Sequence, residues 1–237
     1  MSARHFLIEL HDVTVAQRTA CERMLELVPT DLHAYATVLV VPAWYGHADR
    51  GTESRSWLAP WPGTRVLHGL RHTRGPSLTD AIWYGTQDES ECATLDHAAA
   101  TLHLQQATVA FADVTGARPQ WYCAPRWQCS GALRQALRLQ GLGTLERDSV
   151  TLATGRALDA PSLWFDDGRR ALASFVGGLQ RHLRTSRACA RSSVVRVVLH
   201  PRDAMRPTRA RAVTTLLARL QDDGWTPISL SQLEEVA

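Results

Sequence analysis

Short apolar runs alternate with longer amphipathic stretches along this chain. The run at 36–41 is continuously apolar, which is typical of a strand buried on both faces of a parallel sheet. Further strands are predicted at 6–10, 65–67, 120–123 and 194–200, with weaker candidates at 145–152, 162–165 and 226–230. Apolar residues at helical spacing predict helices over 14–28, 89–116, 130–139, 172–183 and 207–223. This strand–loop–helix order, repeated about seven times, favours a parallel α/β protein.

Two of the predicted helices carry specific local signals. In the longest, 89–116, apolar residues near helical spacing predict a buried face made of Leu95, Ala99, Leu102, Ala107, Ala110 and Val114. Ser130 is the expected N-cap of the helix over 130–139, since its hydroxyl can accept a backbone hydrogen bond in the first turn. The stretch 50–63 is punctuated by tryptophan and proline, and we expect no more than a helical turn there.

Side chains suited to metal binding or catalysis follow several of the predicted strands. In chain order they are His11 and Asp12, His68, Arg126 and Trp127, and His200. In a β/α barrel the carboxyl ends of the strands share one face, and that face carries the active site. An open doubly wound sheet also binds ligands at its strand ends, but no glycine-rich phosphate loop follows the first strand here. We therefore predict an α/β protein with one barrel domain, 1–237, of roughly seven parallel strands.

His68 and His72 form a His-x3-His loop directly after an apolar run, and Asp12 follows another. One carboxylate and two imidazoles are the donor set of a catalytic zinc site with open positions for water. The same residues also have simpler roles, since Asp12 can cap the following helix and two loop histidines can bond the backbone. We predict a divalent metal held by Asp12, His68 and His72. Zn²⁺ is the first expectation, and Co²⁺, Ni²⁺, Mn²⁺ and Fe²⁺ accept the same donors.

Hydrolysis of an amide at such a metal needs a base for the water and an acid for the leaving nitrogen. His11, next to Asp12, and His200, at the end of a distant strand, are the candidates. A hydrogen-bonded core histidine is the alternative for His200. Asp203 is interpreted as a cap or turn residue and is left outside the catalytic set.

The charge of the chain bears on the kinds of ligand that it can bind. The net charge is +3 and the sequence contains arginine but no lysine, a usage that the coding bias of a genome also produces. The arginine-rich segment 181–211 would favour an anionic substrate, because guanidinium binds phosphate and carboxylate in a bidentate way. Nucleic-acid binding is disfavoured, since the arginines are spread along the chain without a recognition motif.

The five cysteines include no CxxC pair, so neither a disulfide framework nor a zinc knuckle is predicted. The N-terminus lacks the pattern of a signal peptide, and no apolar run is long enough to span a bilayer. We therefore expect reduced thiols, no membrane span and a cytoplasmic location.

Taken together, the motifs resemble the polysaccharide deacetylase superfamily (NodB-like, carbohydrate esterase 4). The residues that carry the resemblance are His11-Asp12, His68-x3-His72, Pro125-Arg126-Trp127 and His200-Pro201-x-Asp203, in the family's order. The likeness is to a divergent branch with a His-Asp opening and a late His-Pro-x-Asp motif. It implies a distorted β/α barrel, a divalent metal on Asp12, His68 and His72, and deacetylation of an N-acetylated sugar.

The sequence departs from the family pattern at three places. Typical members open with two adjacent aspartates, the first acting as base, whereas this chain has His11, which either serves as base or only orients the water. Arg126 follows its proline instead of preceding it, so its contact with a substrate carboxylate or a catalytic acid is one option. The segment 165–168 mimics the family's opening motif far downstream, and we interpret it as a turn.

The resulting prediction is a metal-dependent hydrolase that removes an acetyl group from an amide nitrogen of a carbohydrate or sugar conjugate. Trp44, Tyr45 and Trp127 are candidates to stack on the sugar, with Arg126 beside them; core packing is the alternative for the aromatic residues. Two other functions remain open. One is a non-catalytic carbohydrate-binding barrel that retains the metal pocket, and the other is a metal amidohydrolase acting on a small non-sugar amide.

Overall fold

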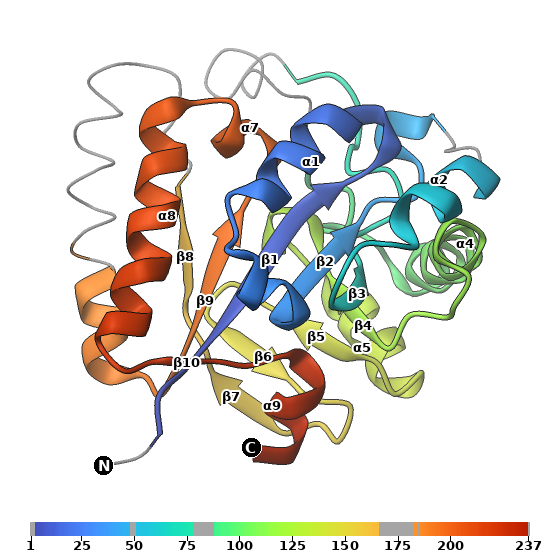
Figure 1. Cartoon of the computed structure of the whole chain (residues 1–237). Helices are drawn as coiled ribbons and strands as arrows, with labels where there is room; N and C mark the ends of the chain where they lie inside the picture. Colours follow the sequence, from blue (N-terminus) through green and yellow to red (C-terminus); the bar gives the residue numbers. More distant parts are fainter. Residues whose placement is uncertain (1–2, 48–50, 78–87, 166–182, 184, 237) are drawn as a thin grey trace.

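A computed structural model describes residues 3–47, 51–77, 88–165, 183 and 185–236 of the chain (Figure 1). Ten strands among them form one sheet, in the order β7-β6-β5-β4-β3-β2-β1-β9-β8, with β10 paired to β1. The strands are β1 His5–Val13, β2 Ala36–Val40, β3 Thr64–Leu67, β4 Trp121–Cys123, β5 Gly143–Leu145, β6 Ser149–Thr151, β7 Ala157–Asp159, β8 Ser162–Trp164, β9 Val194–Leu199 and β10 Thr226–Pro227. The α-helices are α1 Arg18–Glu26, α2 Gly51–Leu58, α4 His97–Thr115, α5 Gly131–Leu139, α7 Pro201–Ala204, α8 Pro207–Asp222 and α9 Leu230–Val236.

The sheet is parallel from β5 through β8 in this order, and β6 and β7 add an antiparallel extension at one end. Backbone hydrogen bonds from Ala160 N to Asp148 O (3.0 Å) and from Ser162 N to Arg147 O (3.1 Å) bring the β5–β6 turn against the start of β8. The sheet therefore curls toward closure without a continuous ladder between its two end strands. The predicted distorted barrel with seven parallel strands is confirmed.

Alternation along β1 explains the two layers of the core. Phe6, Ile8 and Leu10 belong to the larger apolar cluster, which includes side chains of α1, α4, α5 and α8. Leu7 lies in a second cluster on the other face of the sheet, with Leu39 of β2 and residues of α9. Successive strand residues point to opposite faces, so the side chains at positions 7, 9 and 11 enter the concave side of the curled sheet. Figure 1 shows the larger helices around the outside of the sheet and α9 at its lower end.

Several local predictions are corrected. The predicted strand 145–152 is wrong as one strand, because Glu146 and its neighbours turn the chain between β5 and the antiparallel β6. The stretch 50–63 contains the eight-residue helix α2, whose Trp57 and Leu58 are buried. The final predicted strand ends early, and Leu230 instead begins α9. The predicted helix 172–183 lies outside the described residues except for Leu183.

The longest helix begins later than predicted, and its buried face is shifted. Asp96 caps α4 by accepting a hydrogen bond from Ala99 N (2.8 Å), so residues 89–95 lie outside the helix. The buried face is Ala100, Leu104, Ala107, Phe111 and Val114. Leu102, predicted to be buried, is 54% exposed. The cap of α5 is confirmed, since the Ser130 hydroxyl accepts a hydrogen bond from Leu133 N.

Candidate functional site

A pocket of about 350 Å³ opens at the carboxyl ends of the parallel strands. This volume is within the range of small-molecule sites in proteins. Its described lining residues are His11, Asp12, His68, His72, Glu89, Arg126, Trp127, Gln128, Arg147, Trp164, His200 and Arg202. The fold thus brings together all five residues that the sequence suggested for metal binding and catalysis.

A break in the alternation of β1 lets two adjacent residues, His11 and Asp12, face the same pocket. The register between β1 and β2 shifts between Leu10 and Val13, and Asp12 has a left-handed backbone (φ 57°). In a regular strand neighbouring side chains point to opposite faces, so a bulge is needed to re-aim one of them. The pair therefore enters the pocket from the end of a single strand.

The His-x3-His loop is held by a carboxylate from a distant part of the chain. Glu91 Oε1 accepts hydrogen bonds from the backbone nitrogens of Leu70 (2.8 Å) and His72 (3.0 Å), and Arg71 N donates to both carboxylate oxygens. Gly69 (φ 67°) is required beneath it, because a Cβ at this position would lie 2.1 Å from Glu91 Oε1. Glu91 therefore shapes the loop that positions both histidines.

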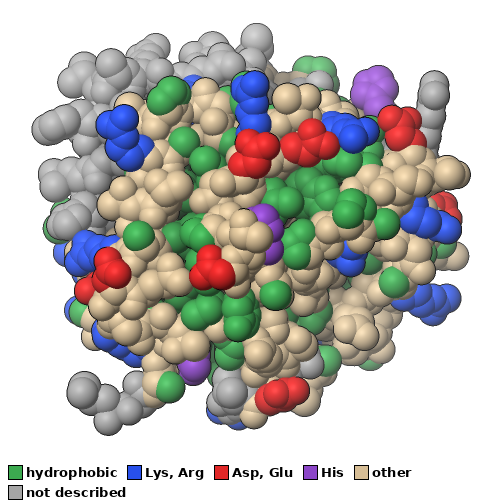
Figure 2. Space-filling view, in the orientation of Figure 1, with side chains coloured by type: hydrophobic (Ala, Val, Ile, Leu, Met, Phe, Trp, Pro, Cys, Tyr) green, Lys and Arg blue, Asp and Glu red, His purple; other side chains and the backbone are tan. Residues whose placement is uncertain are grey.

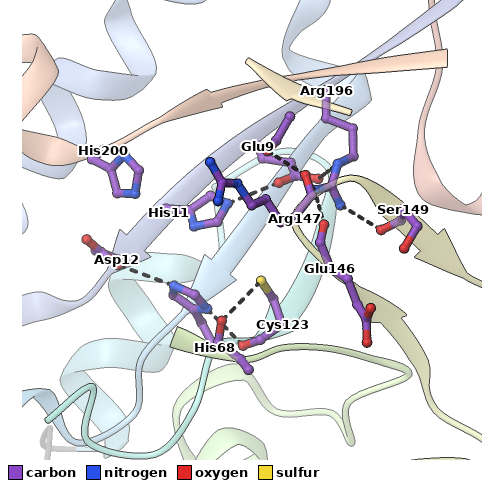
Figure 3. A network of polar contacts seen from close by, with 12 residues as sticks. Glu9, His11, Asp12, His68, Cys123, Glu146, Arg147, Ser149, Arg196 and His200 are labelled. Carbon is purple, nitrogen blue, oxygen red and sulfur yellow. Dashed lines mark hydrogen bonds and ion pairs between the residues drawn. The ribbon is translucent and has the colours of Figure 1, made fainter. Parts of the chain in front are cut away.

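Asp12, His68 and His72 converge on one point. Asp12 Oδ1 lies 3.3 Å from His68 Nε2 and 3.0 Å from His72 Nε2. His68 Nδ1 donates to the carbonyl of Cys123 (2.9 Å), which leaves Nε2 with its lone pair toward Asp12 (Figure 3). All three residues are buried.

These donors fit a divalent cation. Asp12 Oδ1 is buried without a hydrogen bond among the described residues, although it faces two imidazole nitrogens. A carboxylate oxygen and a nitrogen lone pair at 3.3 Å repel each other unless a proton or cation lies between them. Burial lowers the pKa of His68, which favours the neutral imidazole that a metal requires. Burial has the same effect on His72, but the adjacent Asp12 carboxylate outweighs it and raises that pKa.

A buried chain of charged groups lies behind His11. Its Nε2 is 3.0 Å from Glu9 Oε2, and Glu9 Oε1 is 3.5 Å from Arg196 Nε of the adjacent strand (Figure 3). The Arg196 guanidinium also donates to the carbonyls of Glu146, Arg147 and Ser149. Glu9 and Arg196 are both 0% exposed. Burial opposes ionisation of Glu9, but Arg196 and His11 hold its pKa below the usual value.

This arrangement defines the state of His11. Burial, with His68 and His200 nearby, lowers the pKa of His11 to about 3 against the opposing effect of Glu9. The imidazole is therefore neutral at neutral pH, and Nε2 is the nitrogen that donates to the ionised Glu9. Nδ1 is left as the acceptor. His11 thus resembles a histidine oriented by a buried carboxylate.

His200 lies at the end of β9, with its ring 5.0 Å from that of His11. Asp203 Oδ2 is 3.7 Å from His200 Nδ1 and accepts a hydrogen bond from His200 N (2.9 Å). The interpretation of Asp203 as an N-cap or turn residue before Pro207 is corrected, because Asp203 lies within α7 and completes a capping box with the N-cap His200, while Arg206 is the N-cap of α8. It also pairs with Arg209 (3.1 Å), so it holds the segment that carries His200.

The predicted substrate-binding residues divide into two groups. Arg126 and Trp127 line the pocket, and the Trp127 ring lies 5.6 Å from that of His11. Trp44 and Tyr45 do not appear among its described lining residues. Trp44 stacks on Tyr45 and on His72 (4.6 and 5.2 Å between ring centroids), and contact of these two aromatic residues with a sugar stays a prediction.

Tyr45 instead donates a hydrogen bond to Glu89, a carboxyl group that the sequence did not reveal. The distance from Tyr45 Oη to Glu89 Oε1 is 3.2 Å. Glu89 lines the pocket, and burial, together with the nearby Asp12 charge, raises its pKa. Glu89 does not directly follow a predicted strand, so no positional signal pointed to it.

Backbone strain coincides with the site. Among the described residues, the non-glycine residues with positive φ are Asp12, Tyr45, His72, Arg126 and Trp127. All five were sequence candidates. Left-handed conformations are unfavourable for residues with a Cβ and gather at functional sites.

Other functional residues were also missed from the sequence. Glu9 and Arg196 had a signal, because each interrupts an apolar strand with a charge, and the charges are opposite. Glu91 had no signal, since its partners are backbone nitrogens about twenty positions away. The segment 165–168, interpreted as a turn, lies outside the described residues after Phe165.

No protein-family model matches the chain, and no curated protein sequence matches it. Solved structures do match its fold. A CE4 family pseudoenzyme from Bacillus anthracis superposes with a TM-score of 0.61 at 12% identity, over 98% of this chain and 66% of that one. The chain thus spans about two thirds of the pseudoenzyme's length. A mutant of that pseudoenzyme is described as having restored enzymatic activity.

Two catalytic relatives of this fold also match over nearly the whole chain. A family 4 acetyl xylan esterase from Clostridium thermocellum, in complex with a cobalt ion, gives a TM-score of 0.58 at 12% identity, over 98% of this chain and 91% of that one. The peptidoglycan deacetylase PdaC from Bacillus subtilis gives 0.53 at 15% identity, over 99% and 92%. The chain therefore has the fold of the carbohydrate esterase 4, or NodB-like polysaccharide deacetylase, proteins.

Proposed function

We propose that this protein is a metal-dependent deacetylase that hydrolyses the N-acetyl group of a carbohydrate or sugar conjugate. The observation that carries the proposal is the convergence of Asp12, His68 and His72 beside His11 and His200 in one pocket. The fold shared with family 4 esterases and deacetylases supports it. Zn²⁺ is the proposed cation, and the cobalt ion of the acetyl xylan esterase suggests that Co²⁺ can replace it.

A divalent cation bound by Asp12, His68 and His72 would supply Lewis acidity and an acidified water. His11 accepts the proton of the attacking water at Nδ1, while the ionised Glu9 stabilises the imidazolium that forms. The water oxygen bonds to the acyl carbon, and the carbon–nitrogen bond breaks. His200 gives a proton to the departing nitrogen, which leaves as an amine together with acetate.

The second candidate is a non-catalytic binding barrel. The pseudoenzyme with the same fold, and a histidine where typical family members carry the first aspartate, favour it. The two hypotheses share the metal pocket and differ in turnover.

The test is the metal content of the purified protein, measured beside a His68→Ala/His72→Ala variant. His97→Ala is the matched control, because His97 is an exposed histidine at the start of α4. We expect about one metal per chain in the native protein and the control, and loss of the metal in the double variant with its fold retained. Release of acetate from a panel of N-acetyl sugars then follows for the metal-loaded protein.

Absence of metal binding after incubation with zinc or cobalt would contradict the hydrolase proposal. Metal binding without acetate release from any N-acetyl sugar would favour the binding barrel. Release of acyl groups from small amides alone would instead favour an amidohydrolase.

A further inference from the structure

Three arginines from three separate segments meet at the pocket. Arg126 lies in the turn after β4, Arg147 in the turn between β5 and β6, and Arg202 in α7 after β9. All three line the same pocket as Asp12, His68 and His72. They are far apart in the sequence, so the fold, and no local run of basic residues, gathers them.

An aromatic ring orients the side chain of Arg147. Its guanidinium carbon lies 4.6 Å from the ring centroid of Trp164, and the Trp164 ring lies 5.5 Å from that of Trp127. A guanidinium over an aromatic ring keeps the N–H groups in its own plane available, where they can bind an oxyanion. Figure 3 shows the Arg147 side chain extending from the β5–β6 turn toward the His11 side of the pocket.

The acidic groups of the pocket do not offset Arg147. Asp12 faces His68 and His72, and Glu89 accepts a hydrogen bond from Tyr45 and interacts electrostatically with Arg202. Arg126 lies in the field of Asp88, which is not among the described lining residues. Within the described lining of this pocket Arg147 lies over Trp164, while Asp148 and Asp159 line a neighbouring pocket that Arg147 also borders.

We propose that the substrate carries an anionic group, a carboxylate or a phosphate, which Arg147 binds on the face of Trp164 with Arg126 and Arg202 nearby. The acyl-amide group lies at the same time against Asp12, His68 and His72. This inference rests on the proposed function, because it assigns the class of sugar that the deacetylase accepts. Guanidinium binds both oxyanions through paired N–H groups, and an apolar wall strengthens the attraction.

Binding to the zinc-loaded protein, measured by titration calorimetry, tests the inference without requiring turnover. The probes are N-acetylglucosamine, which is neutral, N-acetylmuramic acid, which adds a carboxylate, and N-acetylglucosamine 6-phosphate. We expect at least one anionic probe to bind about tenfold or more tightly than the neutral sugar, because charge-assisted bidentate hydrogen bonds are stronger than neutral ones. Which anion binds identifies the source of the charge.

The variant Arg147→Gln should remove most of this preference. Arg138→Gln, at an exposed arginine of α5, is the matched control and should retain it. Raising the salt concentration should weaken the anionic probe alone. Equal binding of neutral and anionic probes, binding of none of them, or equal behaviour of the two variants would overturn the inference.

The outcomes also separate this inference from the proposed function. Acetate release from neutral sugars with no anionic preference would retain the deacetylase and reject the anionic subsite. Tight, Arg147-dependent binding of an anionic sugar without acetate release would retain the subsite and reject the deacetylase.

Discussion

Glu9 and Arg196 do not line the pocket, but both are fully buried and form an ion pair behind His11, which does line it. A buried ion pair contributes little net stability compared with apolar residues of the same size, because both charges lose their hydration. Its effect here is on His11, whose Nε2 proton it fixes toward Glu9. The pair orients the imidazole, and in the proposed mechanism it supplies a negative charge beside His11 when this residue accepts a proton.

The variant Glu9→Gln would leave the Arg196 charge buried without its partner. We expect the free energy of unfolding to fall by about 3–5 kcal/mol, measured by denaturant titration. The double variant Glu9→Gln/Arg196→Met should recover a large part of that loss while acetate release stays low, because His11 remains without its carboxylate. Full activity in the double variant would contradict the orienting role.

At the scale of elements, the His-x3-His loop depends on the segment that precedes α4. The Glu91 carboxylate accepts hydrogen bonds from the backbone nitrogens of Leu70, Arg71 and His72. These three residues lie outside the helices and strands, so no regular element binds their N–H groups. His72 holds a left-handed conformation within this loop. A carboxylate in this position acts on the candidate metal site by limiting the positions available to His72.

Replacing Glu91 by alanine should lower metal affinity by about 10–100-fold, as expected for a residue that orients a ligand. The affinity is read by competition with a metal chelator. The variant Glu53→Ala, at an exposed glutamate in the first turn of α2, should leave the affinity unchanged. An unchanged affinity for Glu91→Ala would show that the loop keeps its shape without the carboxylate.

The strands that position the site were the elements most readily predicted from the sequence. Runs such as 36–41 and 194–200 are short and mostly apolar, which is typical of strands buried on both faces of a parallel sheet. The pattern failed where a tertiary contact decides the structure. Asp96 sets the start of α4 by one side-chain hydrogen bond, and the β5–β6 turn depends on carbonyls that Arg196 binds from another strand.

The candidate site was predictable where ligand-type residues lie at the end of an apolar strand pattern, as His11, Asp12 and His200 do. Residues that act through backbone groups or through a distant charge were not, because nothing in their local sequence differs from a solvated carboxylate. Trp44 and Tyr45 also follow a strand. Trp44 stacks on His72 and Tyr45 donates a hydrogen bond to Glu89, so both contact residues that line the pocket. The position of a residue after a strand thus predicts that it lies near the site, but not what it does there.

For the whole molecule, the buried carboxylates make stability depend on pH. Burial raises the pKa of Asp203, but His200 and Arg209 outweigh it and hold this pKa below the usual value. A carboxyl group with a lowered folded-state pKa stabilises the protein above its unfolded pKa, near 4, and this contribution is lost as the pH falls through the folded-state value. Glu9 contributes with the same sign.

We therefore expect the free energy of unfolding to decline below about pH 4, measured by denaturant titration at a series of pH values. The variant Asp203→Asn should be less stable at pH 7 by about 3 kcal/mol, because Arg209 loses its buried partner. That deficit should shrink toward pH 2. A deficit that is equal at pH 7 and pH 2 would exclude ionisation of Asp203 as its cause.

The distribution of charge on the surface of the molecule affects which partners it can bind. On the face shown in Figure 2, the arginines lie apart from one another and are interspersed with acidic side chains. No helix among the described residues is long and apolar enough to cross a membrane. The five cysteines are free in this structure. The cytoplasmic location stays a prediction.

The left-handed residues around the pocket have an evolutionary consequence. Each costs about 1–3 kcal/mol, a sizeable part of the 5–15 kcal/mol that stabilises an ordinary domain. Drift readily finds substitutions that relieve such strain, so a pocket released from selection would lose it. Four of the five, Asp12, His72, Arg126 and Trp127, line the pocket, and Tyr45 donates a hydrogen bond to the lining residue Glu89. We therefore expect a protein of this fold that no longer binds or turns over a ligand there to have lost this strain.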